Sequence, residues 1–281
     1  MVFPRLIWAA LFAAVVVGSV QTGVQRWQAA PLILAAEVYE EQKAEAPEPV
    51  TLSADAATTT HTHAEGVAEH EHEHGAGKEW EPENGAERIG WTWVANILHA
   101  FSMTLLAFAV MGVWLYQRGG AVASMRVAGF VAAAGWLSFH FWPTLGLPAE
   151  VPGMEAAPLH ARQIWWVLAV GSAAGASAVA GFMRASWRGP VAAALLALPF
   201  LVGAPHLNGD ALAGYSPEAH AALEQLGSQF IWATTWVSLS FWASLGVVGG
   251  FAFQRWVRPT LLAVLQGTNQ APAMGGVQAP Q

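Results

Sequence analysis

The sequence predicts an all-α protein, a polytopic membrane bundle of about six transmembrane helices with both termini in the cytoplasm. Three observations support this fold class. Of the 281 residues, 54% are hydrophobic and only 11% are charged, too few to cover the surface of a soluble domain of this length. The apolar residues gather in charge-free stretches long enough to cross a bilayer. The charged residues between these stretches sort by sign from one connection to the next.

Six stretches between charged residues have about the length that a membrane-spanning helix needs, roughly 20 residues for a hydrocarbon core of about 30 Å. Helix is the expected form because every backbone polar group in lipid must be satisfied within its own segment. The stretches are residues 6–25, 89–117, 127–149, 163–183, 189–209 and 225–254.

Residues 1–30 carry the first transmembrane helix. A cleaved signal peptide is the alternative, because Arg5 begins the stretch and Ala29 with Ala30 could end it. The apolar run is long for a signal peptide, and Pro31 would sit badly just after a cleavage point. We therefore expect this segment to remain as a helix.

Two local signals mark the fifth and sixth stretches. Pro190 suits a first helical turn, whereas Pro199 interrupts the middle of the fifth stretch and Pro205 closes it, so we expect a short or kinked helix. Ser216 followed by Pro217 is typical of a capped helix start leading into the sixth stretch.

Residues 89–258 make up a five-helix transmembrane bundle, and residues 259–281 a cytoplasmic tail. Residues 31–88 connect the first helix to this bundle as an extracytoplasmic loop rich in His and Glu. The loop has few large apolar residues and should be largely disordered.

The charges give the topology. Six spans put both termini on one side, together with seven arginines and no acidic residue; all 19 acidic residues fall on the other side. The positive-inside rule makes the arginine-bearing side cytoplasmic. The expected location of the chain is the bacterial inner membrane. These arginines are Arg5, Arg118, Arg126, Arg184, Arg188, Arg255 and Arg258.

The long loop carries five closely spaced histidines alternating with Glu and Thr. Imidazole and carboxylate groups in alternation are good ligands for divalent transition metals, and the chain has no Cys to offer thiolates. A solvated polar linker is the alternative. Flexible N/O sites do not by themselves select cobalt over nickel or zinc. The histidines are His61, His63, His70, His72 and His74.

His99 lies about ten residues into the second stretch, roughly 15 Å deep at 1.5 Å per residue and so close to mid-bilayer. An ionisable group at that depth is costly and is a functional candidate, the alternative being a neutral His hydrogen-bonded between helices. Asn96 and Met103 share its helical face and could line a metal path with it.

The other histidines lie toward the outside. His140 is close to the outer end of the third stretch, and His160 follows on the extracytoplasmic side. The last outer connection, between the fifth and sixth stretches, carries four candidate ligands in or beside it: His206, Asp210, His220 and Glu224. His220 and Glu224 are four residues apart and could chelate one ion from the same helical face.

Catalytic motifs are missing from the sequence. Gly77 and Lys78 are followed by Glu79, not by the Ser or Thr of a P-loop, and no nucleophile–base arrangement is visible. We therefore expect no enzymatic activity and no nucleic-acid partner; membrane lipid is the expected surrounding.

Several segments, in this order, resemble the CbtA family of predicted cobalt transporter subunits. They are PLILAAEVYE at residues 31–40, the His-rich loop, FWPTLGLPAE at 141–150, RQIWW at 162–166 and GAPH at 203–206. The resemblance implies cobalt uptake for cobalamin biosynthesis, together with a small single-span His-bearing partner, CbtB. Members of that family are often described with five spans, where six are counted here.

The residues and the resemblance together predict transport of a divalent metal, cobalt(II) first and nickel or zinc as alternatives. The loop would collect ions, His206, Asp210, His220 and Glu224 would form an outer vestibule, and His140 and then His99 would lie deeper. Two other functions stay open. His99 and His140 could ligate one haem in an electron-transfer protein, or the chain could be a metal-buffering scaffold.

Overall fold

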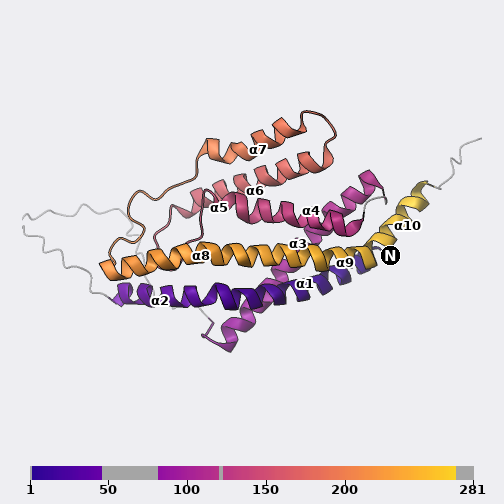
Figure 1. Ribbon diagram of the computed structural model, residues 1–281. Coiled ribbons are helices and arrows are strands. Elements are labelled where there is room, and N and C mark those ends of the chain that lie inside the picture. The colour runs from indigo at the N-terminus through magenta and orange to yellow at the C-terminus, as the bar shows by residue number, and fades with distance from the viewer. Residues whose placement is uncertain (1, 46–81, 120–122, 270–281) are drawn as a thin grey trace, which may run out of the picture.

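The computed structural model describes residues 2–45, 82–119 and 123–269, and the structural statements below concern these residues. Over these ranges the secondary structure is helical and contains no strand, which confirms the all-α class. The helices run along one elongated bundle, and the N-terminus lies at the same end as the last helix (Figure 1).

The first helix continues well beyond its predicted end. α1 (Val2–Gln28) is followed, after a turn at Ala29, by α2 (Ala30–Glu45), and the two lie end to end (Figure 1). The prediction of disorder from residue 31 is therefore wrong for residues 31–45. Ala36 is fully buried against Val151, Leu212 and Leu223, so tertiary packing stabilises a segment whose composition alone resembled a linker.

α3 (Ala86–Arg118) packs closely along α1. A Cβ on Gly18 would lie 2.8 Å from the Ile97 backbone, so the glycine is what lets the two helices approach. Near this crossing the Asn96 amide nitrogen donates to Thr22 Oγ1 at 2.9 Å and to Gln25 Oε1 at 2.6 Å. The α1–α3 pair is thus fixed by small-residue packing and by buried amide hydrogen bonds.

Two further stretches are helical runs interrupted by wide π turns. The third predicted span corresponds to α4 (Ser124–Trp136), η1 (Leu137–Phe141) and α5 (Trp142–Thr144). The sixth comprises α8 (Pro217–Ser244), η2 (Leu245–Gly249), α9 (Gly250–Ala252), η3 (Phe253–Val257) and α10 (Arg258–Asn269). Gly246 and Gly250 lie against α4, where an added Cβ would be 2.9 Å from Ala132 Cβ and 2.7 Å from Ala128 Cβ. The predicted Ser216 cap is confirmed, since its hydroxyl accepts from the Ala219 N–H at 3.3 Å.

α6 (Leu159–Phe182) and α7 (Arg188–Val202) form a hairpin along one side of the bundle (Figure 1). The expected short fifth helix is confirmed: α7 has 15 residues and ends before Gly203, whose φ of 87° stops the helix. The indoles of Trp142 and Trp165 donate to the α7 carbonyls of Leu196 and Pro199, each at 3.0 Å.

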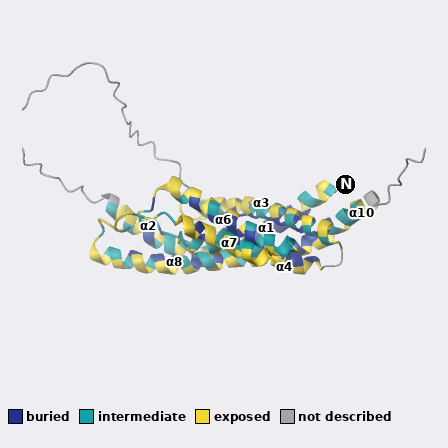
Figure 2. Ribbon diagram, turned by 90° about the horizontal axis from the view of Figure 1, so that it is seen from above, coloured by how far each residue is buried: buried dark blue, intermediate teal, exposed yellow. Residues whose placement is uncertain are grey.

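Four helices in the described ranges are long and apolar enough to cross a membrane: Val2–Gln28, Ala86–Arg118, Leu159–Phe182 and Pro217–Gln266. The run from residue 124 to residue 144 and the shorter α7 would supply the other two, so the count of six stays a prediction. Large apolar side chains such as Phe130, Leu201 and Trp232 are more than 60% exposed, as expected for a surface that faces lipid. Exposed residues occur along the whole helical body (Figure 2).

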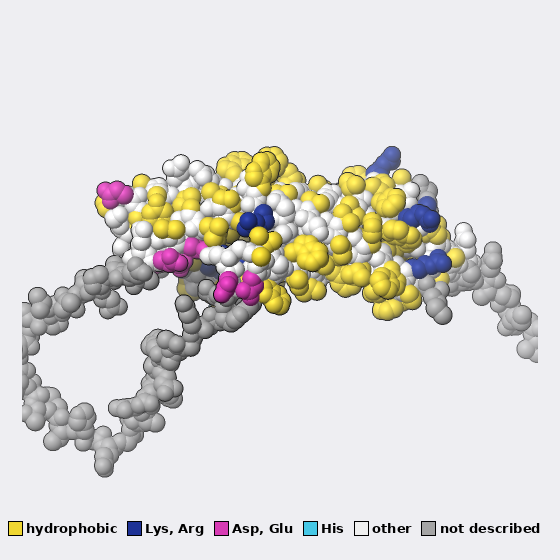
Figure 3. Space-filling model, turned by 90° about the horizontal axis from the view of Figure 1, so that it is seen from below, with side chains coloured by type: hydrophobic (Ala, Val, Ile, Leu, Met, Phe, Trp, Pro, Cys, Tyr) yellow, Lys and Arg dark blue, Asp and Glu magenta, His cyan; other side chains and the backbone are white. Residues whose placement is uncertain are grey.

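The charges lie at the two ends of the bundle. Figure 3 shows the acidic side chains of one face toward one end and most of its Lys and Arg toward the other. The acidic end also holds ion pairs, with Arg88 bonding Glu37 at 2.6 Å and Arg162 bonding Glu150 at 3.1 Å. At the basic end Arg5 donates to Thr260 Oγ1 at 3.0 Å. The sorting of charges read from the sequence is thus also a separation in space.

Candidate metal-binding cavity

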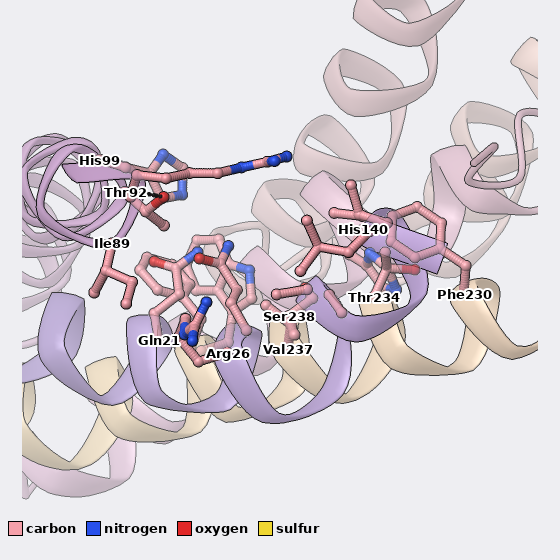
Figure 4. Close-up of a pocket in the computed structure, with 18 of the residues that line it drawn as sticks. Gln21, Arg26, Ile89, Thr92, His99, His140, Phe230, Thr234, Val237 and Ser238 are labelled. Atoms are coloured by element: carbon pink, nitrogen blue, oxygen red, sulfur yellow. Dashed lines mark hydrogen bonds between the residues drawn. The ribbon is translucent and has the colours of Figure 1, made fainter. Parts of the chain in front are cut away.

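A cavity of about 920 Å³ lies in the bundle among α1, α2, α3, η1, α6 and α8, and His99 and His140 both line it (Figure 4). Its apolar wall includes Phe139, Trp166 and Phe241. Its polar lining residues are Gln21, Gln25, Arg26, Asn84, Arg88, Thr92, His99, His140, Thr234 and Ser238.

His99 belongs to the middle of α3, thirteen residues after Ala86 in a helix of 33. Its side chain is exposed to the cavity, and its ring lies 5.0 Å from the ring of Phe241, tilted by 37°. No hydrogen bond to this imidazole is found among the described residues, so the alternative of an interhelical hydrogen bond gains no support. Both ring nitrogens can therefore meet a ligand.

Only part of the predicted stripe on α3 faces the cavity. Met103 lines it with His99, which places a thioether near an imidazole. Asn96 is 7% exposed and bonds Thr22 and Gln25 across the α1–α3 contact, so its amide serves packing. The reason is the close α1–α3 crossing, which covers Asn96 but leaves His99 open.

His140 lies in the π turn η1, four residues before the helical run ends at Thr144, close to the end where it was predicted. Its Nε2 is 3.2 Å from Thr235 Oγ1 on α8, and the Thr144 hydroxyl donates to its carbonyl at 2.6 Å. π turns are frequent at functional sites because they redirect side chains. Here such a turn holds a second imidazole in the lining of the cavity that His99 faces.

The outer residues form a bridge centred on His220. Its Nε2 is 3.3 Å from Asp210 Oδ2, and its Nδ1 is 3.9 Å from Glu224 Oε1. The two carboxylates therefore lie on opposite nitrogens of one ring and do not converge on one point. The pKa of Asp210 is lowered, first by the hydrogen bond that the Leu212 N–H donates to its Oδ1 at 3.0 Å and then by His220.

The remaining predicted ligands do not join this bridge. His160 is exposed in the first turn of α6, and His206 is exposed in the segment after α7. Among residues 2–45, 82–119 and 123–269, no group of three or more His, Asp or Glu side chains is arranged to hold a metal ion. The loop histidines His61, His63, His70, His72 and His74 lie outside the described residues.

Several residues that line the cavity were not predicted from the sequence, because only histidines and acidic residues were considered as candidate ligands. Gln21 and Gln25 lie four residues apart in the first span, as Thr234 and Ser238 do in the last, and such polar pairs inside apolar helices were the available signal. Gln21 is 9% exposed, and its Oε1 has no hydrogen-bond partner in the described structure. The oxygen is shielded from solvent, so this unmet acceptor lies within the wall of the cavity and not on its open surface.

A family model described as "Probable cobalt transporter subunit (CbtA)" matches residues 3–254. The matched region runs from α1 into η3 and contains every residue that lines the cavity. Comparison with curated proteins and with solved structures gave no match.

Proposed function

Because the chain belongs to the CbtA family of probable cobalt transporter subunits, we propose that it moves a divalent transition metal through the cavity between His99 and His140. Cobalt(II) is the proposed cargo, with nickel and zinc as competitors. One observation carries the proposal: imidazoles from two separate spans line a single cavity inside an apolar bundle. Imidazole binds such metals well, and an ionisable side chain inside a membrane is otherwise costly.

The proposed route starts at the histidines of the acidic loop, which would raise the local metal concentration outside the membrane. Asp210, His220 and Glu224, and the exposed His206, would then offer successive weak contacts, since the two carboxylates do not converge on one ion. His140 follows, and His99 is the deepest ligand, with Met103 beside it. Several weak sites in series suit transport, because an ion must leave each site as readily as it enters.

The word "subunit" in the family description implies a partner. We propose a CbtB-like single-span protein bearing histidines, which would assemble with this chain in the bacterial inner membrane. In this scheme the chain is a non-enzymatic, multi-pass component whose cobalt would serve cobalamin biosynthesis.

Uptake of labelled cobalt by proteoliposomes containing the full-length chain tests the proposal. We expect uptake to saturate and to be competed by nickel and zinc. Uptake in His160→Ala, whose imidazole is exposed outside the cavity, should match the original chain, whereas His99→Ala should be inactive. Equal cobalt uptake by empty liposomes would overturn the proposal.

A haem-binding electron-transfer protein is the second candidate, because His99 and His140 line the same cavity and come from separate helices, as haem ligands do in helical bundles. The purified protein distinguishes the two functions. A Soret absorbance that is lost in His99→Ala and in His140→Ala would favour haem, and its absence after growth with sufficient haem would favour metal transport.

A further inference from the structure

We propose that the cavity receives its metal as a complex with a small organic polycarboxylate, and not as a bare hydrated dication. The inference rests on the proposed transport function and names the chemical form of its substrate. Two features of the cavity support it: its size and the sign of its charge.

The cavity is much larger than a hydrated metal ion. A water molecule takes up about 30 Å³ of liquid, so an ion with six waters needs on the order of 200 Å³. The volume here is about 920 Å³. Pockets of about 300–1,000 Å³ are typical of sites for organic molecules, so there is room for the metal together with an organic ligand.

The charge of the lining has the wrong sign for a bare cation. Arg26 and Arg88 line the cavity, and no Asp or Glu is found among its described lining residues. Glu37 bonds the two terminal nitrogens of Arg88 at 2.6 and 3.1 Å and offsets its charge. Arg26 has no ion pair or hydrogen bond with any other described residue, which leaves one net positive charge beside the cavity. A dication is repelled by such a site, whereas an anionic complex is attracted to it.

The same groups match a metal carboxylate complex. A guanidinium presents a planar pair of N–H donors that suits a carboxylate, so Arg26 would bind a carboxylate arm left free by the metal. His99 and His140 would then take coordination positions that the organic ligand leaves open.

The test uses proteoliposomes with the full-length chain, labelled cobalt at fixed total concentration, and labelled citrate as the polycarboxylate. We expect equimolar citrate to raise cobalt uptake and citrate to enter with the cobalt in a ratio near one. Arg26→Gln should lower the rate of cobalt uptake in the presence of citrate about tenfold, because one charge-assisted contact to the complex is lost. Arg162→Gln is the matched control, because Arg162 lies at the same end of the bundle but pairs with Glu150 outside the cavity.

The opposite results separate this inference from the transport function. If citrate lowers cobalt uptake in proportion to the loss of free ion and stays outside, and if Arg26→Gln speeds uptake of cobalt alone, the bare ion is the substrate. That outcome overturns the inference and leaves the transport function standing. If neither cobalt alone nor cobalt with citrate enters vesicles that hold this chain together with its proposed single-span partner, the transport function fails, and this inference fails with it.

Discussion

The imidazole of His99 on α3 lies against the ring of Phe241 on α8, with ring centroids 5.0 Å apart, and it faces the interior cavity. The contact orients the side chain without using either ring nitrogen. A ring held by an apolar neighbour in this way is placed for a ligand from the cavity.

We expect His99→Ala to abolish cobalt uptake even at saturating metal, because the deepest strong ligand of the route is lost. His99→Gln should not restore uptake, since an amide oxygen is a harder and weaker ligand for these metals than imidazole. Uptake by proteoliposomes measures both variants. Near-normal saturating uptake in His99→Gln would refute the role of His99, and a fall in stability of about 0.6–2 kcal/mol without loss of uptake would indicate an interhelical hydrogen bond instead.

Asn96→Leu should reduce thermal stability while leaving saturating uptake largely intact. Its amide bonds Thr22 and Gln25 across the α1–α3 contact, and such intramembrane hydrogen bonds contribute about 0.6–2 kcal/mol. Thermal unfolding in detergent gives the change in stability. Ser102→Ala is the matched control on the same helix, because Ser102 bonds only the carbonyl of Leu98 one turn before it. An uptake defect larger than the stability defect would place Asn96 in the metal route.

Asp210 should make the stability of the outer connection depend on pH. Its pKa is lowered from 3.8, first by the Leu212 N–H and then by His220, so its carboxylate stabilises the folded chain above the unfolded pKa. This stabilisation is lost as the pH falls through the lowered pKa of the folded state. Melting temperatures of the original chain and of Asp210→Asn should therefore differ at neutral pH and converge under acid. A difference that persists unchanged at the lowest pH would contradict this account.

Reporter fusions test the topology on which the route depends. Fusions after Gly120, Gly189 and Gln270 should report the cytoplasm, because these positions adjoin the arginine-bearing connections. Fusions within residues 55–75, near Glu155 and near Gly214 should report the outside. A cytoplasmic signal from residues 55–75 would reverse the direction of the proposed route.

Deleting residues 58–76 should weaken uptake when cobalt is scarce and change little when cobalt is abundant. A tethered group of histidines raises the local metal concentration and adds no step within the membrane. Uptake measured across a range of cobalt concentrations should thus show a higher half-saturation value with an unchanged maximum. Complete loss of uptake at saturating cobalt would show that the loop contributes to the translocation site itself.

Local sequence determined the class of the protein and several of its elements. Long charge-free stretches can only be helices in lipid, so the all-α membrane class followed without any tertiary information. Pro199 and Pro205 predicted the short α7, and Ser216 predicted the cap of α8. Depth along α3 also made His99 a candidate, because the energetic penalty of an ionisable group depends on its distance from the membrane surface.

Tertiary packing decided which residues meet. The close α1–α3 crossing at Gly18 covers Asn96 and leaves His99 open, and the π turn η1 holds His140 in the lining of the same cavity. Ala36 is helical because the outer connections pack over it. These outcomes depend on how helices rotate and approach one another, which hydropathy and residue spacing do not specify. Sequence alone therefore gave candidate ligand types and their expected depth, and packing made a cavity lined by two arginines and two histidines.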